Sequence, residues 1–118
     1  MIEELIARVF CARNAAHLEH WRTKSYAQHV ALCAFYNDIV DALDAVVEAR
    51  QGVFDLVRVG ELPAQPKVQN IVDYLEEDLV FINKNRAKIT GGIAAIDNLL
   101  QSLEDVYMKT LYKLKNLG

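Results

Sequence analysis

"GVFDLVRVGELPAQP", at residues 52–66, is the one long connection in this chain. It contains Gly60, Pro63 and Pro66, which interrupt helices, and it separates two pairs of helical patterns. A connection of about fifteen residues spans up to about 50 Å when it is extended. A helix of about 20 to 25 residues is only about 30 to 37 Å long. The connection is therefore long enough to cross the whole length of a helical bundle.

Two helices are predicted before this connection. The first covers residues 2–22 and ends at Arg22-Thr23-Lys24, and Ser25 is the expected N-cap of the second. The second helix runs to about Arg50, and Gln51-Gly52 ends it. Its apolar residues recur at spacings of three and four, which is typical of an amphipathic helix: Leu32, Tyr36, Ile39, Val40, Leu43, Val46 and Val47.

Two further helices are predicted after the connection. The third begins near Pro66 or Lys67 and is expected to fray around residues 86–89, before Thr90-Gly91-Gly92 forms a hinge or cap. The fourth carries a wide apolar stripe between Ile93 and Leu117. The residues of the third helix that are expected to face inward are Val68, Ile71, Val72, Leu75, Leu79 and Ile82.

The order of connections (short, long, short) predicts the fold class. Short links make the first two helices and the last two helices antiparallel hairpins, and one long crossover joins the hairpins in ferritin-like bundles. We therefore expect an all-α, ferritin-like four-helix bundle that forms a single domain over residues 1–118. A simple up-down bundle with a loose loop is the alternative.

Bulk composition narrows the class of protein. The chain has 118 residues, of which 53% are hydrophobic, and a formal net charge of −3. It has no apolar stretch of membrane-spanning length, no signal pattern and no basic tail, so we expect a cytoplasmic protein that binds neither membrane nor nucleic acid. Cys11 and Cys33 form no C-x-x-C pair, which favours a reducing compartment.

Three polar side chains interrupt the apolar stripe of the first helix. Arg13, His17 and His20 fall among its hydrophobic residues, so they are expected to point toward the interior or a subunit interface. Burying a cation and imidazoles is costly unless each finds a partner. The second helix offers candidate partners: His29, Asp38, Asp41, Asp44 and Glu48.

These residues predict a metal site. Asp44 and Glu48 lie one helical turn apart, where two carboxylates can bind one cation together. Imidazoles from the first helix, at His17 and His20, would complete the ligand set. Mixed nitrogen and oxygen ligands suit iron, manganese or zinc better than calcium or magnesium. A pair of irons held close together would also suit ferroxidase-type activity.

The segment from His17-Leu18-Glu19-His20-Trp21 to Asp44-Ala45-Val46-Val47-Glu48 resembles the Dps branch of the ferritin-like iron proteins. In that branch a first histidine is followed after twelve residues by a second, after fifteen more by an aspartate and after four more by a glutamate. His17, His29, Asp44 and Glu48 reproduce these intervals. The resemblance implies that these four residues are metal ligands, with iron as the metal.

The resemblance also implies a homodimer or a larger oligomer, because ligands in the Dps branch come from two subunits across a dimer axis. Two features depart from its pattern: Cys33 stands where an aspartate is expected, and the tryptophan is displaced to Trp21. Over nearly its full length the chain also resembles small uncharacterised phage proteins thought to be ferritin-like. That likeness would place it in the cytoplasm of a phage host.

Alternatives remain for each of these residues. Arg13 is expected to form a buried ion pair with Asp41, Asp44 or Glu48, which would replace the metal and leave a non-catalytic oligomeric scaffold protein. Cys33 is either a soft ligand or a buried thiol. The acidic run at residues 76–78 is expected to face water. Arg13-Asn14 followed by His20 also loosely resembles the signature of helical HEPN ribonucleases.

Overall fold

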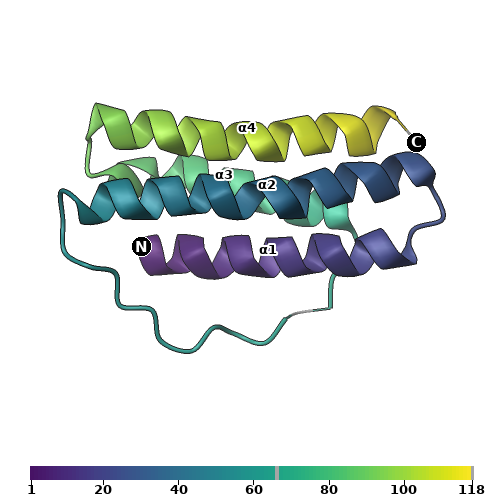
Figure 1. The fold of residues 1–118 in the computed structure, drawn as a ribbon, viewed down its shortest axis with the longest axis horizontal. Coiled ribbons are helices and arrows are strands. Elements are labelled where there is room, and N and C mark those ends of the chain that lie inside the picture. Colours follow the sequence, from purple (N-terminus) through teal and green to yellow (C-terminus); the bar gives the residue numbers. More distant parts are fainter. Residues whose placement is uncertain (66, 118) are drawn as a thin grey trace.

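The computed structural model describes residues 1–65 and 67–117 and contains four helices in that part of the chain. They are α1 (Ile2–Arg22), α2 (Tyr26–Gln51), α3 (Ile71–Thr90) and α4 (Ala94–Asn116). The molecule measures 44 × 28 × 22 Å, with the helices along its longest axis (Figure 1). The predicted all-α four-helix bundle is confirmed.

The first hairpin has the predicted bounds. Its turn consists of residues 23–25, and the Ser25 side chain accepts a hydrogen bond from the backbone nitrogen of Gln28 at 3.2 Å. This bond satisfies one of the backbone N–H groups that have no partner at the start of a helix. A turn of three residues forces α1 and α2 to lie side by side and antiparallel.

The second hairpin differs from its prediction at both ends of α3. Lys67 lies in the irregular connection, and Pro66 is outside the described residues. The helix begins at Ile71 because Asn70 caps it, accepting from the backbone nitrogen of Asp73 at 3.1 Å. The fraying predicted at residues 86–89 is wrong, since the helix continues to Thr90 and ends at Gly91 with a left-handed φ of 62°.

The helices form a square in which α1 contacts α2 and α3, and α4 contacts α2 and α3. Figure 1 shows α1 and α4 running in one direction and α2 and α3 in the other. The connection after α2 runs back along the bundle to the start of α3 at its opposite end. This is the predicted topology with one crossover.

The crossover is attached to the bundle where it leaves α2. The Arg50 guanidinium lies 5.0 Å from the centre of the Phe54 ring, and its Nε donates to the carbonyl oxygen of Ile89 at 2.9 Å. These contacts connect the end of α2 to the end of α3. Both helices end on the left of Figure 1, where the crossover begins.

The core lies along the axis of the bundle, and every helix contributes to it. Its largest fully buried side chains are Tyr107, Phe35, Leu5, Leu32, Ile39, Leu75, Ile82, Ile89, Ile96, Leu100, Leu103 and Val9. Each such side chain stabilises the fold by about 1.5 to 3 kcal/mol relative to exposure. In residues 1–65 and 67–117, no helix has both the length and the apolar character needed to span a bilayer.

Candidate metal centre

The hairpin of α1 and α2 brings two imidazoles face to face near its turn. The rings of His20 and His29 stack with their centroids 3.6 Å apart and their planes 18° from parallel. Nδ1 of His20 donates to the backbone oxygen of His29 at 2.6 Å, and Nδ1 of His29 donates to the backbone oxygen of His20 at 2.8 Å. We call this reciprocal arrangement the histidine clasp.

The clasp determines which ring nitrogens are available to a ligand. Because a carbonyl oxygen can only accept, each Nδ1 carries the hydrogen, and the lone pair of the neutral ring lies on Nε2. Metal-binding histidines commonly have their other nitrogen held by a carbonyl in this way. However, lone pairs lie in the ring planes, so two stacked rings do not direct them toward one ion.

His17 takes part in a separate stack beside the clasp. Its ring lies 4.0 Å from that of Tyr36, only 9° from parallel, and 4.5 Å from that of Trp21. The Arg13 guanidinium lies on Tyr36, 5.5 Å from the ring centre. Desolvation, followed by the positive charge of Arg13, lowers the pKa of His17 below its usual value. His17 is therefore biased toward the neutral form that a metal ligand requires.

The predicted carboxylate ligands lie away from the imidazoles. Asp44 and Glu48 are exposed on the second half of α2. Asp44 is fifteen residues beyond His29, which corresponds to about 22 Å along the helix axis. In the described part of the chain, no group of three or more His, Cys, Asp or Glu side chains is arranged to hold a metal ion.

The buried ion pair predicted for Arg13 is wrong. Its Nη1 donates to the side chain of Asn14, the next residue, at 3.0 Å, and its guanidinium stacks on Tyr36. Arg13 remains half-buried at the flank of α1, where contact with an aromatic ring and with solvent offsets the cost of burial. Consequently Arg13 does not neutralise Asp44 or Glu48 within the chain.

Cys33 lies one turn after His29 and is half-buried. Its Sγ accepts a hydrogen bond from Nδ2 of Asn37 at 3.4 Å. A hydrogen bond with Cys33 is also the main cause that raises the pKa of Tyr36. The thiol thus has polar neighbours on two sides, which differs from the apolar surroundings of a purely structural cysteine.

Sequence reasoning missed a buried carboxylate on α3. Asp78 is only 3% exposed, so its predicted position facing water is wrong. It accepts hydrogen bonds from Nη1 of Arg8 at 3.2 Å and from the Tyr107 hydroxyl at 2.8 Å. Burial raises the pKa of Asp78 to about 6, although both hydrogen bonds oppose this shift. The sequence does carry one signal of this burial: Asp78 lies between Leu75 and Ile82, on the apolar stripe of α3.

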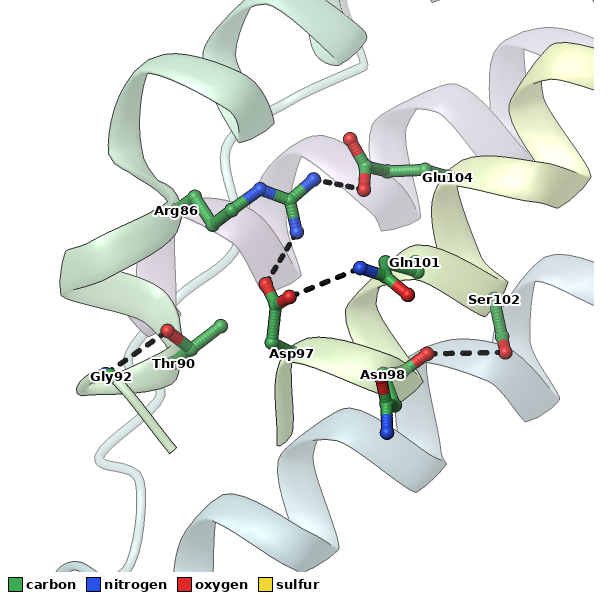
Figure 2. Close-up of polar contacts among 8 residues, drawn as sticks. All are labelled: Arg86, Thr90, Gly92, Asp97, Asn98, Gln101, Ser102 and Glu104. Atoms are coloured by element: carbon green, nitrogen blue, oxygen red, sulfur yellow. Dashed lines mark hydrogen bonds and ion pairs between the residues drawn. The ribbon is translucent and has the colours of Figure 1, made fainter. Parts of the chain in front are cut away.

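A second buried acid lies on α4. Figure 2 shows Arg86 of α3 extending between Asp97 and Glu104 of α4. Its guanidinium binds Asp97 at 2.6 Å and also bonds to Glu104, which is 6% exposed. The hydrogen bond that Arg86 donates to Glu104 is the main cause that raises the pKa of Arg86. This ion pair network connects the helices of the second hairpin and lies outside the imidazole cluster.

The comparison with known protein families supplies one match. Residues 20–114 match DUF5856, which is described as a family of unknown function. The chain belongs to the DUF5856 family. The DUF5856 match includes His20, His29, Asp44 and Glu48, and it starts after Arg13 and His17. Neither a curated protein nor a solved structure matches this DUF5856 chain.

Proposed function

We propose that this protein binds a transition metal at a site that two copies of the chain complete together. In this proposal His17 and His29 of one copy, and Asp44 and Glu48 of the other, are the ligands. Iron, manganese and zinc all suit imidazole and carboxylate donors. Bound iron would add one-electron redox chemistry, whereas zinc would not.

The observation that carries the proposal is that the imidazole and carboxylate donors lie at opposite ends of one hairpin. The imidazoles of α1 and α2 lie near the turn, and the carboxylates lie near the other end of α2. A two-fold axis across this face would pair the two hairpins antiparallel, so that the imidazole end of one copy meets the carboxylate end of the other. Arg13 would add a positive charge at the imidazole end, opposite the carboxylates of the other copy.

Two further features support a metal rather than a salt bridge at this interface. The bundle has the single crossover that ferritin-like bundles share. In addition, Nδ1 of His29 is fixed by the clasp, so its Nε2 is the atom left for a ligand. The donor set therefore fits a borderline metal as a shared site.

Complementation between two inactive variants tests this proposal. We expect wild-type protein, purified without chelator, to retain metal, and His29→Ala and Asp44→Ala each to lose it. When the two variants are unfolded together and refolded, half of the dimers are mixed, and each mixed dimer has one intact site. Metal binding should then return to about a quarter of the wild-type level.

Asp41→Ala is the matched control, because Asp41 is another exposed carboxylate of α2 that the proposal does not use. It should retain the wild-type metal content. A wild-type protein without metal, or a mixture that recovers none while wild type is metal-bound, would contradict the proposal. Elemental analysis gives the metal content, and sedimentation gives the number of subunits.

A non-catalytic interaction protein is the second candidate. The stacking of His20 on His29 favours it, because two stacked rings do not direct their lone pairs toward one ion. The large exposed fractions of Trp21 (68%) and Tyr26 (81%) beside the clasp also favour it. For this candidate, Trp21→Ala should weaken self-association in metal-free protein, and no variant should change metal content.

A further inference from the structure

His29 and Cys33 lie one turn apart on α2 and line the same groove. The groove has a volume of about 500 Å³, and His20, Asn37 and Asp38 also contribute to its walls. Residues four positions apart on a helix have their Cβ atoms about 5 to 6 Å apart, which allows both side chains to bind one ion. Both side chains are half-buried, so they are accessible from the groove.

The neighbours of both side chains suit ligand roles. Nδ1 of His29 donates to the His20 carbonyl, which leaves Nε2 for a metal. Asn37 donates to Sγ of Cys33, as groups around a metal-bound thiolate commonly do. The two contacts are independent, since one comes from α1 and the other from the next turn of α2.

We propose that His29 and Cys33 together form a nitrogen and sulfur half-site that makes zinc the preferred metal of this protein. The inference rests on the proposed function, because His17 and the carboxylates of a second copy supply the remaining ligands. Thiolate is a soft ligand that favours zinc over manganese and other metals that prefer oxygen. A carboxylate at residue 33 would instead supply a hard oxygen ligand, which suits iron better than a thiolate does.

Cobalt substitution tests for a thiolate ligand directly. Co²⁺ occupies zinc sites, and a bond from Co²⁺ to thiolate gives an intense charge-transfer absorption in the near ultraviolet. We expect this absorption in wild-type protein titrated with Co²⁺ and its loss in Cys33→Ser. Zinc affinity of Cys33→Ser should fall by about tenfold or more.

Cys11→Ser is the matched control. Cys11 is the other cysteine of the chain and is buried on α1, away from the groove. This variant should retain both the absorption and the zinc affinity of wild type. Cys33→Asp should bind metal but lower the ratio of zinc affinity to Fe²⁺ affinity relative to wild type. Circular dichroism of each variant verifies that the bundle is folded.

The outcomes separate this inference from the proposed function. Wild-type protein that binds Co²⁺ without the charge-transfer absorption, or a Cys33→Ser variant equal to wild type, overturns the thiolate ligand alone. In that case His17, His29, Asp44 and Glu48 still account for metal binding. Wild-type protein that binds none of Co²⁺, Zn²⁺, Fe²⁺ and Mn²⁺ overturns both.

Discussion

The ring of Phe54 packs over Gly91, so closely that a Cβ added at Gly91 would overlap the ring and lie 2.8 Å from its Cε2 atom. Gly91 also has a φ of +62°, the left-handed conformation that ends α3. The glycine is thus required both for backbone conformation and for space. Through this contact, the beginning of the crossover is held against the turn of the second hairpin.

We expect Gly91→Ala to lower the free energy of unfolding by more than Gly92→Ala does. Both glycines have positive φ, which costs a residue with a Cβ about 1 to 2 kcal/mol, but only Gly91 has a neighbour within 4 Å. In a Phe54→Ala background, Gly91→Ala and Gly92→Ala should lower the free energy of unfolding by equal amounts. Urea unfolding of the single and double variants measures them, and equal costs in the wild-type background would contradict the Phe54 contact.

Asp78 should make stability depend on pH between about 4 and 6. Its pKa is about 6 in the folded protein against 3.8 for an ordinary carboxyl, so the folded state binds the proton more tightly. The resulting stabilisation is complete below pH 3.8 and is lost as the pH rises through 6. A shift of about two pH units corresponds to about 3 kcal/mol.

Asp78→Asn should remove this dependence. We expect the stability of the variant relative to wild type to improve by about 3 kcal/mol from pH 3 to pH 7. Asp41→Asn changes an exposed acid on α2 that takes no part in raising the pKa of Asp78, and it should leave the pH profile of wild type unchanged. A difference between wild type and Asp78→Asn that is constant with pH would disprove the assignment.

Removing Arg86 should lower the free energy of unfolding more than removing a surface ion pair does. Arg86→Ala leaves Glu104 buried without its cation, and such losses cost about 3 to 5 kcal/mol. Lys109→Ala breaks the exposed pair with Asp105 and should lower the free energy of unfolding far less, because exposed ion pairs contribute little to stability. The double variant Arg86→Met/Glu104→Leu should recover most of the loss. Similar unfolding midpoints for Arg86→Ala and Lys109→Ala would argue against this account.

The histidine clasp predicts a defined tautomer of His29. In wild-type protein, ¹⁵N NMR should find the hydrogen of the neutral His29 ring on Nδ1, because Nδ1 donates to a carbonyl. His20→Ala removes the stacked ring and one hydrogen bond, so it should broaden this signal and destabilise the fold by about 1 kcal/mol. His17→Ala should leave the signal in place. A mixture of tautomers in wild type would contradict the clasp.

Much of the fold follows from local sequence. Ser25 caps α2 as predicted because the cap and the backbone nitrogen that it satisfies are only three residues apart. The crossover follows from the length of the connection between two hairpins. The predicted start of α3 is wrong because Val68 fits the apolar spacing of α3, whereas the side chain of Asn70 decides where the helix begins.

The site was less predictable because its contacts depend on distant partners. Asp78 is buried through Tyr107, 29 residues away, and Arg8, 70 residues away, and the local run of acids gives no indication of either. The sequence predicts a carboxylate partner for Arg13, but in the fold its guanidinium lies on the ring of Tyr36. The pairing of His20 with His29 depends on the angle between α1 and α2, which periodicity does not determine.

The three-residue turn between α1 and α2 has a consequence for how a metal would be held. His17, His29 and Cys33 lie within seventeen consecutive residues, so grafting this one segment onto another antiparallel helix pair transfers all three donors. The proposed carboxylates must instead arrive on a different molecule. Occupancy would then rise with protein concentration, and dilution alone would release the ion.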